Sequence, residues 1–529
     1  MRTAVKARYA LLLALIVYWL LTFVMLGTSL LKNNGHLGYP LDDTYIHMAI
    51  GKHFANDGFW GISQTGFSSS TSSPLWTFLI AITYKSLGMS DWTPFVLSLL
   101  SGSFLVLSCY YWLRRIANPL RLTAFLVLIV LLAPLPVLTL TGMEHVLHSL
   151  LTIWLTYCAA TYSTRATRSS GQFTLLLLLA GLLTITRYEG LFLVFSIVLL
   201  FSIKRRFWAA FLIGGAGVLP ITVYGVYSMA QGWYFLPNSV LLKGNAPVLT
   251  WEGMAGFLKH LLINLVVAPH VLVLIIACLA IFLWSEKQRT SGEKERSLIA
   301  IFLPMALLHM LFADIGWFYR YESYLVLAGS VILVETLGSV IADRLAEVGE
   351  TLDRIIVITL GILFITPLAW RAGKAIKEYP IAVTNIYEQQ YQMGIFLQKY
   401  YSGKTVAAND MGAINYLANI ETLDLYGIGN VEVARARRNS LYSREMISDL
   451  VSMNNVEIVV IYDDWFEGNI PPEWIRIGKW QIANNVVCGS DTVSFYVPAM
   501  SLQAEAIANL RSFSDLLPST VRQSGAYTQ

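Results

Sequence analysis

The sequence predicts a polytopic α-helical membrane protein with a C-terminal soluble α/β domain. Of its 529 residues, 56% are hydrophobic and only 13% are charged, and the mean hydropathy is +0.57. Apolar segments that could cross a hydrocarbon core of about 30 Å recur as far as residue 370. From Arg371 onward, polar residues increase and apolar runs shrink to strand length. A wholly soluble protein would need a more charged surface, so that class is excluded.

The N-terminal segment is predicted to be an uncleaved signal anchor. Residues 9–31 form an apolar run that is longer than the core of a signal peptide. Arg2, Lys6 and Arg8 precede it, and positive residues favour the cytoplasmic side. We therefore expect the N-terminus in the cytoplasm and the first outer loop, residues 32–92, on the other side.

The topology depends on residues 73–87, an apolar piece that could be a span or an interfacial helix. Counting it as a span would place Arg114, Arg115 and Arg121 outside, against the positive-inside rule. We interpret it as an interfacial or re-entrant helix, which leaves about eleven transmembrane helices. The predicted spans are residues 9–31, 92–113, 121–135, 143–161, 172–186, 189–203, 207–229, 258–284, 297–313, 322–341 and 355–370.

The chain is predicted to have three parts. A transmembrane module covers residues 1–370, an extracytoplasmic α/β domain covers 371–500, and a tail covers 501–529. The tail is polar and is expected to form a weak helix followed by a frayed end. In the α/β domain, strands are expected within 404–416, 456–462 and 492–497, and helices at 388–401 and 443–453. A net charge of +4 without a basic patch indicates that no nucleic acid is bound.

Asp42 and Asp43 are the most informative residues of the chain. They follow the first apolar segment closely, and two adjacent carboxylates at a membrane surface are costly unless they are used. They also begin a predicted helix, residues 43–56, whose N-terminal dipole favours negative charge. A helix cap could explain the pair alone, but further charges on the same side of the membrane favour a functional site.

Ionisable residues recur at the predicted outer ends of other spans. Glu144 and His145 open the fourth span, and Arg187 and Glu189 lie at the junction of the fifth and sixth. One interpretation is a structural ion pair of Arg187 with Glu144 or Glu189 that holds helix ends together. For Arg187 we favour an anionic ligand, because a planar guanidinium suits phosphate.

Two later outer segments add cations and aromatic residues. Lys243 follows Leu236-Pro-Asn238 closely, and Arg320 lies in the segment that runs from Asp314 to Glu322. Together with Arg187, these cations suit a phosphate leaving group beside a sugar. Anchoring of Lys243 or Arg320 to lipid headgroups is the alternative.

These residues resemble motifs of the GT-C glycosyltransferases, and more closely of the branch that includes the mycobacterial cell-wall arabinofuranosyltransferases. The family pattern Asp-Asp-Ala-Tyr-Ile is similar to residues 42–46, and Thr-x-Pro-Leu-Trp-Thr is similar to residues 72–77. Further motifs of the family look like residues 142–144, 186–190, 236–238, 409–414 and 423–427. The chain departs from the pattern at Tyr188, where the family usually has proline, and keeps the aromatic motif at 314–322 only loosely.

The resemblance implies a GT-C fold and transfer of a sugar from a polyprenyl-phosphate donor. The implied donor lipid is undecaprenyl or decaprenyl phosphate, the sugar could be a pentofuranose such as arabinofuranose, and the expected outcome is inversion. The acceptor would be a cell-envelope glycan or lipid. The reaction would take place at the bacterial cytoplasmic membrane, with the site and the α/β domain facing outward among membrane lipids.

The resemblance also implies roles for the outer residues. Asp42 or Asp43 would act as general base on the acceptor hydroxyl, while the other orients an arginine, the acceptor or a metal. Arg187, Lys243 and Arg320 would bind the donor phosphate. The other residues expected to bind substrate are Tyr45, His47, Trp76, Glu144, His145, Glu189, Asn238, Asp314 and Trp317.

A divalent cation, such as Mg²⁺, Mn²⁺ or Ca²⁺, is left open, because some GT-C enzymes that resemble this chain use one. Asp42, Asp43 and Glu144 could supply oxygen ligands. Histidines also occur on the outer side, but lone histidines more often pack or form hydrogen bonds than bind metal.

Asp410 and Asp424 of the α/β domain could contact the acceptor glycan. Aspartates that form turns beside strands are the commoner explanation.

Two other classes of membrane protein also have many apolar segments. A transporter or flippase should carry charges in the middle of helices and show matched halves, whereas here the charges gather at outer helix ends. An O-antigen polymerase or ligase would use a lipid diphosphate donor, and we would not expect the early Asp-Asp loop together with the later soluble domain. Both are kept as alternatives.

Overall fold

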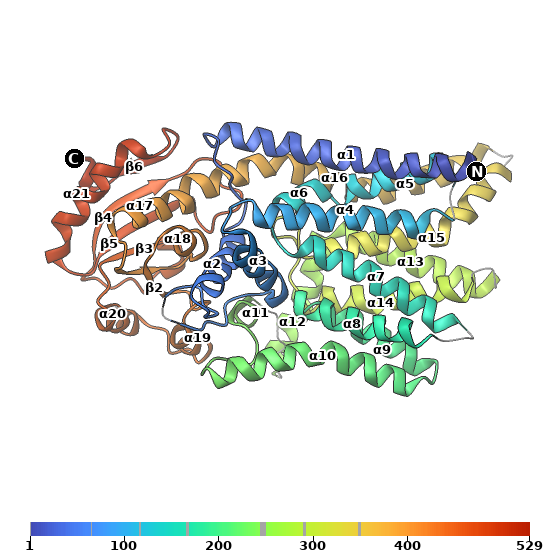
Figure 1. The fold of residues 1–529 in the computed structure, drawn as a ribbon, viewed down its shortest axis with the longest axis horizontal. Coiled ribbons are helices and arrows are strands. Elements are labelled where there is room, and N and C mark those ends of the chain that lie inside the picture. The colour runs from blue at the N-terminus through green and yellow to red at the C-terminus, as the bar shows by residue number, and fades with distance from the viewer. Residues whose placement is uncertain are drawn as a thin grey trace. The chain divides into compact units, whose positions relative to one another are not determined.

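Figure 1 shows the computed structural model of the chain, which describes residues 2–64, 66–115, 118–165, 169–243, 250–288, 292–347 and 351–529. The chain divides into two compact units. The helical unit consists of Met1–Met25, Phe95–Val223 and Lys243–Lys377, and the α/β unit consists of Leu26–Pro94, Tyr224–Leu242 and Glu378–Gln529. The predicted first outer loop thus belongs to the same unit as the C-terminal segment, and not to the transmembrane module.

The helical unit is built from apolar helices, four of which (α1, α4, α10 and α16) continue in sequence past its limits. Its helices are α1 (Arg2–Lys32), α4 (Thr93–Leu113), α5 (Pro119–Leu132), α6 (Leu135–Leu140), α7 (His145–Thr164), α8 (Ser170–Thr186), α9 (Gly190–Ile203), α10 (Phe207–Ala230), α12 (Trp251–Val267), α13 (Pro269–Gln288), α14 (Glu293–Phe312), α15 (Ser323–Glu347) and α16 (Thr351–Ile386). A helix is present at every predicted span.

Among the described residues, four helices are long and apolar enough to cross a membrane, namely Ala7–Lys32, Thr93–Leu113, Phe207–Ala230 and Glu293–Phe312. Four more are apolar but shorter, namely Pro119–Leu132, Ser170–Thr186, Gly190–Ile203 and Ser323–Leu337. The span predicted over 258–284 is broken, because α12 and α13 meet at a bend of 90°. Length and composition alone therefore support fewer than eleven full spans.

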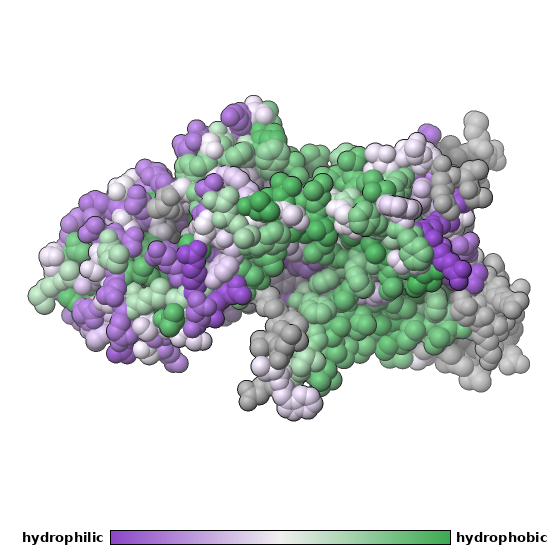
Figure 2. Space-filling view, turned by 90° about the horizontal axis from the view of Figure 1, so that it is seen from below, coloured by the Kyte–Doolittle hydropathy of each residue, from purple (hydrophilic) through white to green (hydrophobic). Residues whose placement is uncertain are grey.

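The outer surface of the helical unit is apolar. Figure 2 shows hydrophobic residues over most of its visible face, whereas hydrophilic residues gather on the visible face of the α/β unit. Leu20, Phe211 and Val266 are 60%, 69% and 80% exposed. An apolar surface of this extent is costly in water and favourable in hydrocarbon, as expected for a membrane-embedded bundle.

The helices of this unit pack closely, as α1 and α4 illustrate. Gly102 of α4 lies against Tyr18 of α1, where an added Cβ would be 2.1 Å from the Tyr18 hydroxyl oxygen. That hydroxyl is buried and lies 2.7 Å from Thr139 Oγ1. A small residue at position 102 therefore allows the two helices to approach.

The α/β unit contains a mixed sheet of six strands. The strands are β1 (Thr405–Ala408), β2 (Glu421–Asp424), β3 (Ile458–Ile461), β4 (Ile475–Gln481), β5 (Thr492–Val497) and β6 (Arg522–Ser524). Their order is β2-β1-β3-β5-β4-β6, with β1 parallel to β2 and β3 and the remaining pairs antiparallel. The three strands predicted from the sequence are β1, β3 and β5.

Helices cover both faces of this sheet (Figure 1). One face packs on α19 (Val431–Arg438) and α20 (Arg444–Met453), with Val433 and Leu450 in the shared core. The other face packs on α17 (Gln392–Tyr400) and α21 (Gln503–Phe513), where the ring of Phe396 lies 5.7 Å from Trp480 and 5.4 Å from Phe513. The strands alternate between these two cores because successive side chains point to opposite faces.

The prediction of a frayed C-terminal end is wrong. Residues Arg522–Ser524 form β6, which pairs with β4, and Tyr527 is only 2% exposed. Gly525 (φ 120°) lets the chain turn so that the Tyr527 ring packs over Gly478. Composition could not reveal this, because a short edge strand of polar residues has no apolar alternation.

Three helices of the α/β unit come from outside the C-terminal segment, namely α2 (Asp42–Asn56), α3 (Pro74–Leu87) and α11 (Asn238–Lys243). The Ser73 hydroxyl accepts the N–H of Trp76 and so caps α3. The helix predicted at the interface over 73–87 is therefore confirmed as a helix. α2 packs against α3 and against α18 (Gly412–Leu417), which follows β1.

Candidate functional site

A group of polar residues lies at the carboxyl ends of three parallel strands of the α/β unit. Asn409 and Asp410 follow β1, Asp424 ends β2, and Tyr462 follows β3. Parallel neighbours end at the same edge of a sheet, and this edge is where ligands commonly bind in α/β folds.

Asp42 is bound at this edge. Its Oδ2 accepts the N–H of Gly412 (2.7 Å) and its Oδ1 accepts the N–H of Ala413 (2.8 Å), at the start of α18. The approach is close, because a Cβ on Gly412 would be 2.0 Å from the Asp42 carbonyl oxygen. Burial raises the pKa of the Asp42 carboxyl to about 7; the charge of Asp410 adds to the rise, and the two N–H donors oppose it.

Asp43, the second residue of α2, is partly exposed. Both predicted catalytic aspartates are therefore in the first turn of this helix, where the dipole favours negative charge. Leu41, the residue before α2, makes no capping bond with its side chain, and the bond of Asp42 to another segment distinguishes it from a simple cap.

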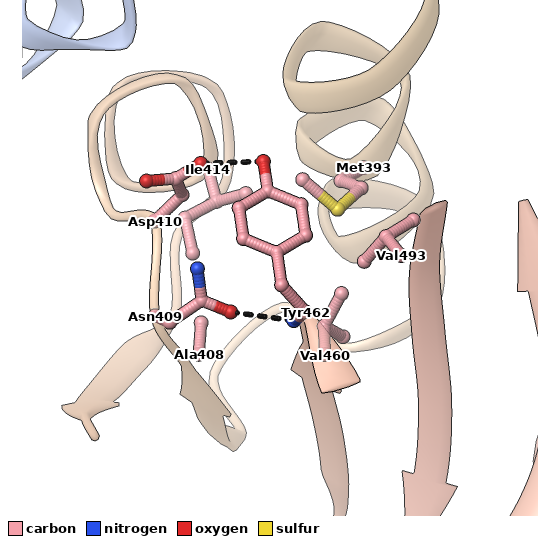
Figure 3. A pocket seen from close by; sticks show the side chains of 8 residues that line it. All are labelled: Met393, Ala408, Asn409, Asp410, Ile414, Val460, Tyr462 and Val493. Carbon is pink, nitrogen blue, oxygen red and sulfur yellow. Dashed lines mark hydrogen bonds between the residues drawn. The ribbon is translucent and has the colours of Figure 1, made fainter. Parts of the chain in front are cut away.

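A buried polar network surrounds Asp410. The hydroxyl of Tyr462 donates to Asp410 Oδ2 (2.6 Å), and Gln390 Nε2 donates to the same oxygen (3.0 Å). Asn409 Oδ1 accepts the backbone N–H of Tyr462, as Figure 3 shows beside the cavity that these residues line. This cavity has room for roughly one water molecule and is too small for a sugar.

Asp424 shapes the loop that follows β2. Its carboxylate accepts the N–H groups of Tyr426 (2.7 Å) and Gly429 (2.6 Å). Burial raises its pKa to about 6, although these N–H donors oppose the rise. The expectation that Asp424 forms a turn is confirmed.

Asn238 joins the loop after β2 to the first outer loop. Its Nδ2 donates to the Gly427 carbonyl (2.8 Å), and its backbone N–H donates to the Ser69 carbonyl (2.9 Å). Asn238 is completely buried. Motifs from four distant parts of the chain therefore meet in the α/β unit.

Three predicted substrate-binding residues of the first loop are buried. Tyr45 is 2% exposed and its hydroxyl accepts the Tyr39 N–H, while His47 Nδ1 lies 2.7 Å from Thr77 Oγ1. Trp76 is 1% exposed in α3. These three side chains are therefore part of the packed interior beneath the first outer loop.

Arg187 of the helical unit is bound by carboxylates. Its Nη1 donates to Glu144 Oε1 (2.6 Å), and its Nη2 and Nε donate to the two oxygens of Glu189 (2.5 and 3.1 Å). His145 Nε2 lies 2.8 Å from the same Nη1. Both ion pairs that the sequence offered as alternatives are formed, which favours the structural interpretation of Arg187.

Arg320 lies close to Arg187, because both guanidinium groups stack on Tyr321. Their central carbons lie 5.0 Å (Arg320) and 5.5 Å (Arg187) from the centre of that ring. Arg320 is 1% exposed, and its Nη1 lies 2.5 Å from Met143 Sδ. Two of the three predicted phosphate-binding cations are thus brought together.

The segment before Arg320 has an unusual backbone. Trp317 is 51% exposed at φ 27°, and Asp314 lies 3.9 Å from His260. Glu322 and Arg371, neither of which was singled out from the sequence, form a buried ion pair beside this segment. They are 49 residues apart, so no local pattern could have joined them.

The side chain of the third predicted cation, Lys243, lies outside the described residues. Two of the residues predicted as oxygen ligands of a divalent cation have polar partners within their own units: both oxygens of Asp42 accept N–H groups, and Glu144 Oε1 accepts Arg187. Within the described part of the chain, no group of three or more His, Cys, Asp or Glu is arranged to hold a metal ion.

The fold is similar to that of two solved structures of GT-C glycosyltransferases. One is ArnT from Cupriavidus metallidurans bound to undecaprenyl phosphate, with a TM-score of 0.56 and 12% sequence identity. The similarity extends over 93% of this chain and 98% of the ArnT chain. The Archaeoglobus fulgidus oligosaccharyltransferase, in a complex with Zn and sulfate, has a TM-score of 0.51 at 12% identity. This likeness covers 91% of this chain and 73% of the other.

The chain has the GT-C fold. In sequence, a family described as a domain of unknown function (DUF8728) matches residues 384–496, within the α/β unit. No curated protein has a significantly similar sequence.

Proposed function

We propose that the protein is an integral membrane glycosyltransferase that transfers a sugar from a polyprenyl-phosphate donor. The observation that carries this proposal is the position of the aspartate pair of α2 in a chain with the GT-C fold. The bonds of Asp42 to Gly412 and Ala413 hold this pair at the carboxyl edge of the sheet. The undecaprenyl phosphate bound by ArnT supports a donor of this lipid class.

Asp43 is the general base that takes the proton of the acceptor hydroxyl, and Asp42 is a positioning residue. Both oxygens of Asp42 already accept backbone N–H groups, so its carboxylate fixes the first turn of α2 against α18. Asp43 follows it in that turn, and its side chain is partly exposed. A base at this position contributes roughly 10²–10⁴-fold to the rate of such transfers.

Arg320 is the main group that stabilises the charge of the leaving polyprenyl phosphate. A fixed cation costs no reorganisation during the reaction, and its effect is stronger in a site that excludes water. Arg187 holds Glu144 and Glu189 in place and shares the Tyr321 ring with Arg320. Lys243 is the third candidate phosphate ligand.

The sugar is a pentofuranose such as arabinofuranose, and the acceptor is a cell-envelope glycan or lipid. Support comes from the motifs at 42–46 and 72–77 and from their assembly with 236–238, 409–414 and 423–427 in one unit. The enzyme resides in the bacterial cytoplasmic membrane, with the α/β unit on the outer side.

The test is transfer by purified protein in detergent. Radiolabelled decaprenyl-phosphate arabinofuranose, undecaprenyl-phosphate hexoses and nucleotide sugars are each offered with a membrane glycan extract. We expect transfer from a polyprenyl-phosphate donor and none from nucleotide sugars, with the pentofuranose preferred. Transfer from hexosyl donors only would refute the pentofuranose assignment, and transfer from nucleotide sugars alone would refute the donor class.

A further inference from the structure

The segment between α14 and α15 adopts a left-handed backbone over four consecutive residues. Gly316, Trp317, Phe318 and Tyr319 have φ values of 87°, 27°, 58° and 62°. Only glycine adopts this region at no cost, and side chains at Phe318 and Tyr319 make it unfavourable. Such a turn persists only when its surroundings hold it, and it commonly marks a functional site.

Glu322 holds the beginning of the turn. Its Oε2 accepts the backbone N–H of Gly316 (2.9 Å), while its Oε1 accepts Nε–H of Arg371 (2.8 Å) and lies 3.3 Å from His270 Nε2. Glu322 is 1% exposed, so these bonds are shielded from water.

Arg371 of α16 holds the end of the turn. Its Nη2 donates to the Tyr319 carbonyl, and its guanidinium carbon lies 5.7 Å from the centre of the Tyr319 ring. Arg371 is 4% exposed. The buried ion pair of Glu322 and Arg371 therefore forms hydrogen bonds to both ends of the left-handed turn.

The turn leads directly into Arg320. The Arg320 N–H donates to the Gly316 carbonyl (3.2 Å), so the position of Arg320 depends on the conformation of the turn. Any relaxation of Gly316–Tyr319 to right-handed geometry would move Arg320 away from Met143 and Tyr321.

We propose that Glu322 and Arg371 are positioning residues that hold the Gly316–Tyr319 turn so that Arg320 is preorganised for the donor phosphate. This rests on the proposed function, in which Arg320 binds that phosphate. Neither residue needs to touch substrate, since both act through the backbone of the turn.

The first test compares Arg371→Gln with wild type in detergent. Hydrogen exchange of the amides in 314–322 should rise about tenfold or more, and the Kd for polyprenyl phosphate should rise about tenfold. The matched control is Glu335→Gln, because Glu335 lies in α15, is also buried and pairs with Lys294 (2.7 Å), away from this turn. The control should leave exchange in 314–322 and affinity unchanged.

The second test is rescue by glycine. Tyr319→Gly removes the conformational cost at φ 62° and keeps the carbonyl, so adding it to Arg371→Gln should recover part of the lost affinity and protection. If Arg371→Gln does not fold, Arg371→Lys, which keeps the charge but not the fork of donors, should show a smaller effect in the same direction. A merely structural ion pair would show no rescue, and that result would overturn the proposal.

The variants Arg320→Gln and Arg371→Gln together distinguish the positioning role of Arg371 from the phosphate-binding role of Arg320. If Arg320→Gln abolishes binding of polyprenyl phosphate while Arg371→Gln changes neither exchange nor affinity, the positioning role is wrong and the function stands. If Arg320→Gln binds like wild type, the phosphate role is wrong, and the inference falls with it whatever the exchange data show.

Discussion

At the scale of single residues, Asp42 is held in surroundings that favour its protonated form. Its pKa is raised to about 7 by burial and by Asp410, whereas in the unfolded chain the carboxyl has its ordinary value near 4. Between about pH 4 and pH 7 the folded protein thus binds a proton that the unfolded chain has released. Stability falls as pH rises through this window, by up to about 1.4 kcal/mol per pH unit.

Asp42→Asn should therefore flatten the decline of Tm with pH in this window. The remaining slope belongs in part to Asp424, whose pKa is raised to about 6. The control, Asp57→Asn, removes an exposed carboxylate just after α2 and measures what the loss of a surface charge alone does to Tm. Thermal unfolding in detergent at several pH values measures this, and an unchanged slope in Asp42→Asn would contradict the assignment.

The two arginines that share the Tyr321 ring should respond differently to substitution. Arg320→Gln should weaken binding of polyprenyl phosphate roughly 10- to 100-fold, as expected for loss of a charge-assisted bond. Arg187→Gln leaves Glu144 and Glu189 uncompensated and should mainly lower stability, by roughly 3–5 kcal/mol. Binding measurements and thermal unfolding separate the two. A loss of affinity in Arg187→Gln at unchanged stability would return the phosphate role to Arg187.

At the scale of elements, the junction of α2 and α18 requires glycine. A Cβ at position 412 would lie 2.0 Å from the Asp42 carbonyl and 2.7 Å from both carboxylate oxygens. Gly412→Ala should push the first turn of α2 away, cost about 1–3 kcal/mol of stability and lower transfer through the displaced Asp43.

The control is Gly373→Ala, an exposed position in α16 where a Cβ meets nothing within 4 Å. It should be neutral or slightly stabilising. Equal Tm and transfer rate in Gly412→Ala and wild type would show that the close approach of α2 and α18 is not needed.

The limits of α2 illustrate what the sequence could and could not predict. A helix from 43 to 56 is within one residue of Asp42–Asn56, because acidic residues in a first turn are a local signal. The N–H donors of Gly412 and Ala413 lie 370 and 371 residues away, so their pairing with Asp42 has no local signature. For the same reason the sequence could offer Glu144 or Glu189 as partner of Arg187, but not show that both bind.

Secondary structure was predicted best where packing produces a pattern. β3 is a continuous apolar run and β5 is mostly apolar, because both lie inside the sheet with helices on both faces. The sequence did not reveal β2 and β6, which lie at the two edges and are largely polar, or β4, in which polar residues interrupt the apolar ones. Edge strands bury less, so their sequences are less constrained.

At the scale of the whole molecule, the resemblance of short motifs and the likeness of the fold agree on the GT-C class. The motifs are far apart in sequence, yet those of the first loop, 236–238, 409–414 and 423–427 assemble in the α/β unit, while 142–144 and 186–190 assemble in the helical unit. The α/β unit therefore contains Asp42 and Asp43, and the helical unit contains Arg187 and Arg320.

Single-turnover transfer separates the roles proposed for Asp42 and Asp43. Wild type, Asp43→Asn and Asp42→Asn are each loaded with labelled decaprenyl-phosphate arabinofuranose, and bound donor and transferred sugar are measured separately. Asp43→Asn should bind donor normally and transfer at least about 100-fold more slowly, while Asp42→Asn retains more activity. Transfer at the wild-type rate by Asp43→Asn would show that Asp43 is not the general base.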